Sequence, residues 1–336
     1  MSSVKLENID KSFGNIKALS NLNLEINDGE FFVLLGPTGA GKTTTLRVIA
    51  GLEKVDNGKI FFNEEDISNV QPAFRDTCYV FQQYSLYPHY TVYNNLAFPL
   101  KSPLRKLNNN EIDNRIKEIA KLLKIETKLQ NKATELSGGE MQRVSLGRAL
   151  VREPNIYLMD EPLSSLDAKL REELRIELKK IQTDLNATIL YVTHDQIEAT
   201  TMADRIGVLK EGILTQVGTP QKIYNEPNSI YVANRLGSPK INIVEIEKIN
   251  SSQNSSASFV GIRPEDIRID SNGEYDVKIE MTELIGAETL VSFKSDTISG
   301  ILLTQDNISV GEGDNIKIGI NESKVLYFDK NEQKIK

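Results

Sequence analysis

The feature that most constrains the fold is an apolar run, Phe31–Leu35, that leads directly into a glycine-rich segment, 36–43. A continuous apolar run of this length is typical of a strand that is buried on both faces of a parallel sheet. The segment 36–43 follows the pattern G-x-x-x-x-G-K-[ST], and a helical stretch begins at Thr44. Strand, glycine-rich turn and helix in this order predict an α/β domain.

The glycine-rich segment has the chemistry of a phosphate site. Its glycines permit backbone angles that turn successive N–H groups inward, and the following helix start favours negative charge. In this pattern Lys42 reaches the β- and γ-phosphates, and the Thr43 hydroxyl is a ligand for Mg²⁺. The segment therefore predicts Mg-ATP binding. The residues predicted to hold the nucleotide here are Gly36, Pro37, Thr38, Gly39, Ala40, Gly41, Lys42, Thr43 and Thr44.

Two acidic residues and a histidine follow other predicted strands. Asp160 and Glu161 come after the apolar run 156–159, and His194 comes after the run 188–192. The carboxyl ends of parallel strands lie beside the phosphate loop, so Asp160 is predicted to hold Mg²⁺ directly or through water. Glu161 is then predicted to orient or deprotonate the attacking water, and His194 to contact the γ-phosphate. Outside this context, an acidic pair or a lone histidine is most often a loop or surface feature.

A second anion site is predicted at 137–139. Ser137 is a good helix N-cap, and Gly138 and Gly139 expose backbone N–H groups at the positive end of a helix. Alone, a Ser-Gly-Gly sequence is usually only a capped turn.

Length and composition predict two domains. A chain of 336 residues is long for one domain, and 39% hydrophobic residues allow a large core without disulfides. The single cysteine, Cys78, is interpreted as a small core residue. We expect an α/β domain at 1–235, with a helical subdomain at about 85–150. A breaker at 237–239 precedes short strand-like runs at 275–279, 289–293 and 315–318, which predict a small all-β domain at 236–336.

Charge and hydropathy exclude some classes of function. No apolar run approaches the ~20 residues that span a bilayer, so the chain is expected to stay in the cytoplasm and reach a membrane only through a partner. Residues 240–336 carry 11 Lys and Arg against 17 Asp and Glu. Such an acidic region is a poor nucleic-acid surface, and no nucleic-acid partner is expected.

Together these motifs resemble the nucleotide-binding subunits of ATP-binding-cassette (ABC) transporters. The segment 136–140 is similar to the family signature, Gln82 to the glutamine of the glutamine loop, and 164–167 to the loop after the catalytic acid. The resemblance implies an α/β P-loop ATPase that forms a head-to-tail dimer. Each ATP would lie between one phosphate loop and the partner's Ser137, Gly138 and Gly139. It also implies that Phe13 stacks on adenine, that Gln82 senses Mg²⁺ and the water, and that Asp167 acts across the dimer interface.

One position departs from the family pattern. The signature usually ends in glutamine, but here it ends in Glu140. A carboxylate near a triphosphate is unfavourable, whereas an acidic residue in a first helical turn is favourable for the helix. We expect an altered affinity for ATP and no loss of function.

The C-terminal third resembles the importer ATPases of the maltose and glycerol-3-phosphate type, through the segments 218–227, 237–242 and 261–265. These carry an OB-like regulatory domain, and they act at the cytoplasmic face of the membrane with permease subunits and, indirectly, an extracytoplasmic solute-binding protein. The resemblance implies uptake of a carbohydrate or related solute. Importers of iron, sulfate and polyamines share parts of this layout. A non-transport ABC ATPase acting on nucleic acid is a further alternative, which the acidic C-terminal region disfavours.

Overall fold

The computed structural model describes residues 1–103, 107–249, 256–305 and 310–335, in two compact units. The first unit is Met1–Pro220 and the second is Gln221–Lys336. The segment 221–235, which the sequence assigned to the first domain, is therefore part of the second unit. In the described ranges no helix has both the length and the apolar character needed to cross a membrane.

A mainly parallel sheet forms the centre of the first unit. Five of its strands run parallel, and only the edge strand β10 is antiparallel. Every residue of β3, β7 and β8 is buried, which confirms the prediction from their continuous apolar runs. In spatial order the strands are β10 (Ile213–Gly218), β9 (Arg205–Lys210), β3 (Phe31–Leu35), β8 (Ile189–Thr193), β7 (Ile156–Asp160) and β6 (Thr77–Val80).

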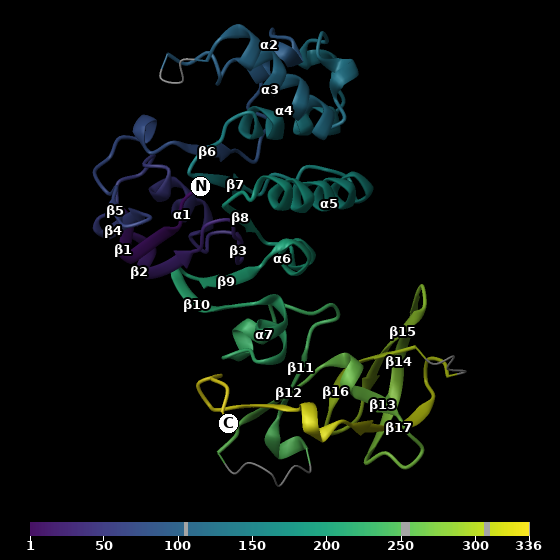
Figure 1. Ribbon diagram of the computed structural model, residues 1–336. Helices are drawn as coiled ribbons and strands as arrows, with labels where there is room; N and C mark the ends of the chain where they lie inside the picture. The colour runs from purple at the N-terminus through teal and green to yellow at the C-terminus, as the bar shows by residue number, and fades with distance from the viewer. Residues whose placement is uncertain (104–106, 250–255, 306–309, 336) are drawn as a thin grey trace. The chain divides into compact units, whose positions relative to one another are not determined.

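A second, antiparallel sheet and helix α1 (Lys42–Ile49) share one apolar core with the parallel sheet. Fully buried side chains from β3, β8, α1 and the antiparallel strands meet there, among them Leu34, Leu190 and Leu46. Figure 1 shows α1 between the two sheets. The antiparallel strands, in spatial order, are β2 (Ile16–Ile26), β1 (Val4–Phe13), β4 (Asn57–Phe62) and β5 (Glu65–Asp66).

The remaining helices of this unit form two groups. Helices α2 (Val92–Ala97), α3 (Asn109–Leu122) and α4 (Gly138–Leu150) pack on one another near β6, within the segment predicted to be helical. Helices α5 (Ala168–Leu185) and α6 (Gln196–Met202) follow β7 and β8 and contact each other (Figure 1). Cys78 is buried in β6, as its apolar context predicted.

The C-terminal end of α1 is held by a buried arginine. Arg75 is 4% exposed, and its Nη1 donates hydrogen bonds to the carbonyl oxygens of Val48 (2.8 Å) and Ile49 (2.9 Å). Its Nε and Nη2 donate to the carbonyl oxygens of Val70 (2.8 Å) and Ser68 (3.0 Å). Burial lowers the pKa of the Arg75 guanidinium. A cation at a helix C-terminus is favourable, so this contact ties α1 to the segment that precedes β6.

The second unit is built on two antiparallel sheets, which confirms the predicted small β domain. Side chains from both sheets fill its core, including Val260, Val277 and Val291. One sheet is β11 (Asn242–Glu245), β12 (Phe259–Ile262) and β18 (Leu326–Phe328). The other is β13 (Ile267–Ile269), β17 (Asn315–Ile320), β14 (Tyr275–Ile285), β15 (Glu288–Lys294) and β16 (Ser299–Thr304). The short helices α7 (Pro220–Asn225) and α8 (Ile230–Ala233) precede the strands.

Candidate nucleotide site

The glycine-rich loop begins where β3 ends and closes at the first turn of α1. Gly41 has a φ of +103°, and a Cβ there would lie 2.6 Å from the carbonyl oxygen of Ala18, so the position requires glycine. The N-terminus of α1 has no side-chain cap and no acidic residue in its first turn. No side chain of the described residues therefore competes with an anion for this helix end.

Lys42 is folded back over the loop. Its Nζ donates hydrogen bonds to the carbonyl oxygens of Gly36 (2.9 Å) and Pro37 (3.1 Å), and it lies 3.3 Å from Glu161 Oε1. The lysine is 5% exposed. A buried cation in the centre of a backbone loop is the arrangement that can exchange carbonyl oxygens for phosphate oxygens.

Asp160 is the last residue of β7, which is separated from β3 by β8, and its side chain meets the loop that follows β3. Its Oδ1 accepts a hydrogen bond from Thr43 Oγ1 at 3.0 Å, and its Oδ2 accepts one from the Tyr79 hydroxyl at 2.8 Å. Burial, together with the charge of Asp160, raises the pKa of Tyr79 well above its ordinary value, so the phenol stays a donor. The two predicted magnesium ligands thus lie together, and a tyrosine fixes the orientation of the carboxylate.

Glu161 follows with an unusual backbone. Its φ is +44°, in the left-handed region that non-glycine residues seldom occupy, although Glu211 (+48°) and Glu332 (+62°) adopt it as well. Its Oε2 lies 2.9 Å from His194 Nδ1, and its Oε1 faces Lys42. His194 is 58% exposed, whereas Glu161 is 16% exposed. The structure therefore brings together the predicted base, the predicted phosphate lysine and the predicted phosphate histidine.

Gln82 approaches the same group through a serine. Its Nε2 lies 3.4 Å from Ser164 Oγ, and that hydroxyl donates to the carbonyl oxygen of Glu161 at 2.8 Å. Gln82 itself is exposed, just after the end of β6. The contact with Ser164 places the Gln82 side chain near Glu161. The Asp160 oxygens are hydrogen-bonded to Thr43 and Tyr79 instead.

The predicted second anion site is at the start of α4 and is closed by its own side chains. Ser137 Oγ accepts a hydrogen bond from the backbone N–H of Glu140 (3.3 Å), and Glu140 Oε2 accepts from the Ser137 N–H (2.8 Å). Glu140 Oε1 also pairs with Lys128 Nζ at 3.0 Å. The Ser137 N–H, followed by Lys128, lowers the pKa of Glu140. In the described part of the chain, no hydrogen bond joins Ser137 to the phosphate loop, and Figure 1 shows α4 apart from α1.

The glycines of this segment differ from each other. A Cβ on Gly139 would lie 2.2 Å from Leu170 Cδ2, so a larger residue there requires the Leu170 side chain of α5 to move. A Cβ on Gly138 would meet only the Tyr84 hydroxyl at 3.6 Å, an ordinary contact. Sequence reasoning gave both glycines the same role in anion binding and missed this packing constraint.

The two other predicted nucleotide contacts lie at exposed positions. Phe13 ends β1 and is 44% exposed, with Lys11 Nζ 4.9 Å from the centre of its ring. Asp167 is the N-cap of α5, where its Oδ1 accepts a hydrogen bond from the Leu170 N–H at 3.0 Å. Both side chains are accessible to a ligand or to a second molecule.

Tyr79 is the residue of the site that sequence reasoning missed. Its contact with Asp160 joins positions 81 residues apart in the chain, and in sequence it belongs to an ordinary buried strand. The available signal was its place in β6, two residues before Phe81 and three before Gln82, which brings its hydroxyl to the carboxyl edge of the sheet.

Strand β3, the loop after it and the acid that ends β7 define the class of P-loop nucleotide-binding proteins. The ABC transporter family model matches residues 19–164. The sn-glycerol-3-phosphate import ATP-binding protein UgpC of Brucella abortus biovar 1 is 49% identical over 306 residues, and the match covers 87% of each chain. The trehalose/maltose import ATP-binding protein MalK of Thermococcus litoralis is 41% identical over 367 residues, covering 98% of each.

Solved structures agree with these relatives. The dimeric structure of MJ0796, a bacterial ABC transporter cassette, has a TM-score of 0.58 at 33% identity and covers 65% of this chain and 98% of that one. The relatives span most of the present chain at an identity that leaves no doubt about common descent. The chain belongs to the ABC transporter family.

Proposed function

We propose that this chain binds Mg-ATP and hydrolyses it to drive import of a carbohydrate or a related solute, such as glycerol 3-phosphate, through membrane permease subunits. Two of its relatives are named for the import of such solutes, and they align with the second unit as well as with the first. The observation that carries the proposal is the carboxylate of Glu161. Its two oxygens lie against Lys42 and His194, beside a loop shaped for phosphates.

The proposed reaction begins with a change of partners at Lys42. When ATP enters the loop, the ammonium turns from the carbonyl oxygens and from Glu161 to the β- and γ-phosphates. The freed Glu161 oxygen then accepts a proton from water as the water oxygen attacks the γ-phosphorus and the bond to ADP breaks. His194, which now holds the other carboxylate oxygen, is proposed to orient Glu161 and to contact the γ-phosphate.

The residues at the strand ends fit a magnesium ion. Thr43 Oγ1 and Asp160 Oδ1 are hard oxygen ligands 3.0 Å apart, and the Gln82 amide is proposed as a further ligand. In the described ranges there is no cluster of three His, Cys, Asp or Glu residues that could bind a metal alone. Mg²⁺ does not need such a cluster, because it keeps waters and uses phosphate oxygens as ligands. When bound, the ion would neutralise negative charge on the phosphates.

We propose that the complete site needs a second copy of the chain in head-to-tail contact. The partner's Ser137, Gly138 and Gly139 would face the γ-phosphate, Asp167 would contact the opposite subunit, and Phe13 would stack on adenine. The start of α4 forms no hydrogen bond to the phosphate loop within the described chain, which supports a role toward another molecule. Two solved cassette structures of 33% and 34% identity are titled as dimers, one of them bound to ADP and Pi.

The remaining assignments follow from this function. The first unit, predicted from the sequence as residues 1–235, is proposed as the ATPase domain, and the second, predicted as 236–336, as an OB-like regulatory domain. The chain is proposed to lie peripherally at the cytoplasmic face of the membrane. Permease subunits would be direct partners, and an extracytoplasmic solute-binding protein an indirect one. Co-purification of permease subunits from membranes would support this assignment, whereas co-purification of RNA or DNA would overturn it. Uptake assays with iron, sulfate or polyamine would test the alternative solutes.

The Glu161→Gln variant tests the catalytic proposal. It should retain ATP binding and form a stable ATP-bound dimer, while kcat falls by about 10²- to 10⁴-fold, the usual contribution of a general base. Turnover measured by phosphate release and dimerisation measured by light scattering give the two readouts. Glu172→Gln, at an exposed position of α5, is the matched control and should behave as wild type. Turnover of Glu161→Gln within a few-fold of wild type would refute the base.

A further inference from the structure

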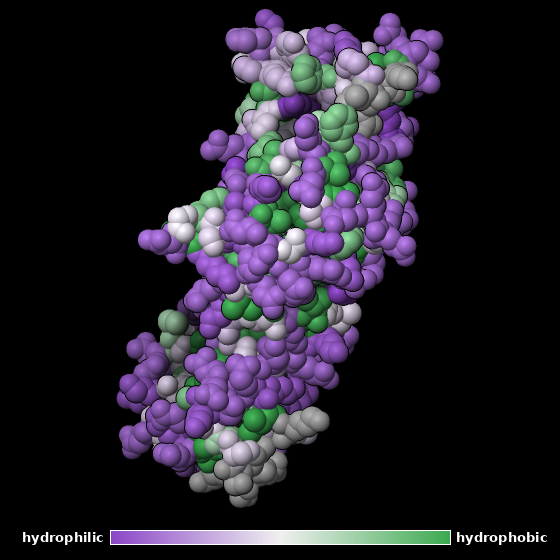
Figure 2. Space-filling view, turned by 90° about the vertical axis from the view of Figure 1, so that its left-hand side faces the viewer, coloured by the Kyte–Doolittle hydropathy of each residue, from purple (hydrophilic) through white to green (hydrophobic). Residues whose placement is uncertain are grey.

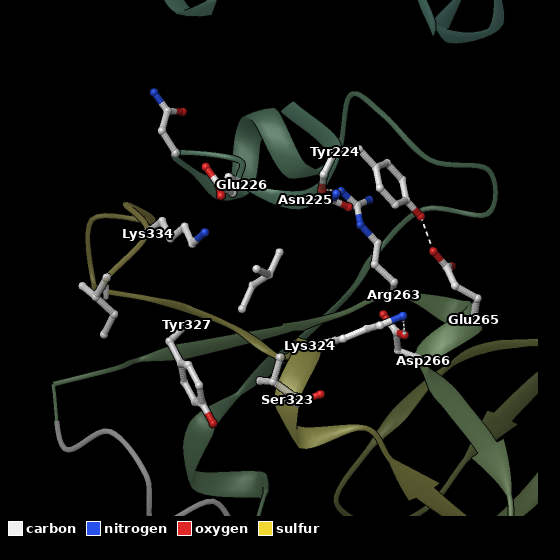
Figure 3. Close-up of a pocket in the computed structure, with 14 residues that line it drawn as sticks. Tyr224, Asn225, Glu226, Arg263, Glu265, Asp266, Ser323, Lys324, Tyr327 and Lys334 are labelled. Carbon is white, nitrogen blue, oxygen red and sulfur yellow. Dashed lines mark hydrogen bonds and ion pairs between the residues drawn. The ribbon is translucent and has the colours of Figure 1, made fainter. Parts of the chain in front are cut away.

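Hydrophilic residues cover most of the face drawn in Figure 2, so polar side chains that are buried are the informative exceptions. In the second unit, buried Arg263 lines the cavity drawn in Figure 3 and donates to backbone carbonyl oxygens, among them that of Leu236 (2.7 Å). These contacts join segments of that unit. In the first unit, a buried polar cluster lies beside the candidate nucleotide site, and it consists of Tyr191, Thr193 and Glu198.

The cluster lies on both sides of His194 in the chain. Strand β8 ends at Thr193 and helix α6 begins at Gln196, so the connection that carries His194 is only two residues long. The His194 side chain is 58% exposed, and its Nδ1 lies 2.9 Å from Glu161 Oε2. An exposed side chain on so short a connection is held in place mainly through the backbone of its neighbours.

The Thr193 hydroxyl holds the backbone that follows it. Thr193 is 2% exposed, and its Oγ1 donates to Glu198 Oε2 at 2.6 Å and accepts a hydrogen bond from the Asp195 N–H at 3.0 Å. Because the single hydroxyl proton is directed at Glu198, its lone pairs are left to face Asp195. The second hydrogen bond spans His194, so it restricts the backbone dihedrals on both sides of the histidine.

Glu198 is held by a second hydroxyl from the same strand. Glu198 is 3% exposed, and its Oε2 also accepts a hydrogen bond from the Tyr191 hydroxyl at 2.9 Å. Burial, followed by the charge of Glu198, raises the pKa of Tyr191 well above its ordinary value, so the phenol stays a donor. Tyr191 and Thr193 are two residues apart in β8 and therefore share one face of the strand. Both hydroxyls meet on one oxygen from α6.

The end of β8 also contacts the other parts of the site. The carbonyl oxygen of Val192 accepts a hydrogen bond from the Glu161 N–H at 3.1 Å, and that of Thr193 accepts one from the Gly36 N–H at 3.4 Å. The strand end thus lies between the phosphate loop and the predicted base. A rotation of the backbone after Thr193 would leave these strand contacts in place but would change the separation of His194 from Glu161.

We propose that Thr193 and Glu198 are positioning residues for ATP hydrolysis, which fix this turn so that His194 meets the Glu161 carboxylate. The inference rests on the proposed function, in which His194 orients Glu161 and contacts the γ-phosphate. Because a buried carboxyl group must be desolvated, it stabilises a fold less than apolar packing of the same volume would. Orientation, rather than stability, is what this contact supplies.

Thr193→Val tests the inference, because valine keeps the shape of the side chain and lacks the hydroxyl. Misplacement of a catalytic group by about 1 Å lowers rates by up to about 10²-fold, and we expect kcat to fall about 10-fold. The KM for ATP should change by less than about 3-fold, since the phosphate loop is not altered. Thr193→Ser keeps the hydroxyl and should restore most of kcat. Phosphate release by the full chain measures these constants.

The matched control is Thr188→Val, just before the other end of β8. Thr188 is also fully buried, and its Oγ1 likewise accepts a hydrogen bond from a backbone N–H, that of Gly29 (2.9 Å), and donates to a carboxylate, that of Asp28 (3.1 Å). The control therefore removes a comparable pair of hydrogen bonds from the same strand, away from His194. It should leave kcat unchanged.

A second readout does not depend on turnover. The chain has two histidines, His89 and His194, so the ring signals of isotope-labelled histidine can be followed by NMR and assigned with His89→Gln. Thr193→Val should move the His194 signal and leave the His89 signal in place. Thr188→Val should move neither signal.

Glu198 provides a second pair of variants. Both of its hydrogen bonds end on Oε2, so Glu198→Gln retains an oxygen that can accept them, and kcat should stay within about 3-fold of wild type. Glu198→Met removes the acceptor at similar length, and it should lower kcat about 10-fold, as Thr193→Val does.

Combination with His194→Ala shows whether Thr193 acts through the histidine. If it does, Thr193→Val should lower kcat by less than about 2-fold in the His194→Ala chain. An equal loss of kcat in both backgrounds overturns the inference. A His194 signal that moves no more in Thr193→Val than in Thr188→Val overturns it as well.

The same assays separate this inference from the proposed function. A low kcat in His194→Ala, together with wild-type kcat in Thr193→Val and Glu198→Met, would overturn only the positioning role. Wild-type turnover of His194→Ala would overturn the proposed role of His194 in hydrolysis, and the positioning role with it.

Discussion

Two helices of the first unit start beside glycines and were both predicted to bind anions at their N-termini, but these N-termini differ. Helix α1 starts after Gly41 with no side-chain cap and no acidic residue in its first turn. Helix α4 starts after Ser137, and Ser137 and Glu140 satisfy each other's backbone N–H groups. The first N-terminus is open to a ligand, whereas the second is stabilised by a carboxylate of its own chain.

The difference teaches that a glycine-rich helix start is not by itself an anion site. At α1 the surrounding groups add a buried lysine and the acid that ends β7, so phosphate binding is prepared within one chain. At α4 the capping box already provides local stability. A phosphate that approaches α4 must therefore come with contacts from elsewhere, which is what the proposed dimer supplies.

The largest effect is expected at the N-terminus of α1, which has no side-chain cap. Lys42→Ala removes the buried ammonium that would meet the phosphates, and we expect the Kd for ATP to rise by about 100-fold or more, since bonds to charged groups contribute about 1.5–3 kcal/mol each. Equilibrium binding of a fluorescent ATP analogue measures this. Lys59→Ala, which removes only a surface ion pair with Asp66, is the control. Tight ATP binding in Lys42→Ala would show that the open helix end suffices without the lysine.

The next effect concerns the packing of Gly139, in the first turn of α4, against Leu170. Gly139→Ala places a methyl group 2.2 Å from Leu170 Cδ2, so Leu170 must move. We expect the free energy of unfolding to be about 1 kcal/mol lower than in Gly138→Ala, which shares any gain in helix propensity. Denaturant titration measures the loss. Gly138→Ala is the matched control, because its methyl group would meet only the Tyr84 hydroxyl at 3.6 Å. Equal stability of the two variants would contradict the packing role of Gly139.

A smaller effect is expected from Tyr79, which holds Asp160 beside the N-terminus of α1. Tyr79→Phe removes the hydrogen bond to Asp160 Oδ2 while leaving the ring in place. Asp160 should then hold the metal less firmly, and the Mg²⁺ concentration for half-maximal ATPase activity should rise about 3- to 10-fold, with a smaller change in kcat. The magnesium dependence of ATP binding in the Glu161→Gln background gives a readout without turnover. An unchanged magnesium dependence in both assays would contradict a positioning role for Tyr79.

The smallest effect is expected from Glu140, which is part of the capping box of α4. Glu140→Gln keeps a side-chain acceptor for the Ser137 N–H but removes the charge that pairs with Lys128. If the partner's ATP lies over this helix start, losing the negative charge should lower the KM for ATP about 2- to 3-fold. Steady-state ATPase assays decide this, and an unchanged KM would mean that the triphosphate does not sense Glu140.

The same residue predicts a dependence on pH. The Ser137 N–H and Lys128 hold the pKa of Glu140 below its ordinary value, so its contribution to stability is present at neutral pH. That contribution is lost as the pH falls through the lowered pKa, and Glu140→Gln should remove this part of the acid sensitivity. Chemical denaturation of both chains between pH 7 and about pH 3 measures it.

Much of the fold could be predicted from local pattern. The strands β3, β7 and β8 are continuous apolar runs, and their parallel arrangement places Asp160 beside the phosphate loop, as expected. It was harder to predict from the sequence which domain the segment 221–235 belongs to, because its short helices continue the α/β pattern of the preceding chain. Only tertiary packing assigns this segment to the second unit.

The sequence predicted which residues lie together at the candidate site, but it did not predict the contacts between them. Glu161 was predicted to be the base from its position, but its left-handed backbone and its contact with Lys42 depend on how separate segments of the chain meet. Tyr79 was not singled out, because it acts through a partner that is distant in sequence. A side chain whose role is set by long-range partners leaves no local signal.

The hydrogen bonds between Arg75 and the C-terminal end of α1 limit how this helix can move. Any shift of α1 along its axis must either break the hydrogen bonds that Arg75 makes to Val48 and Ile49 or carry the segment 68–75 with it. That segment runs straight into β6 and so toward Gln82. The Arg75 guanidinium thus joins the C-terminal end of α1 to the segment that leads into β6, so the two are expected to move together.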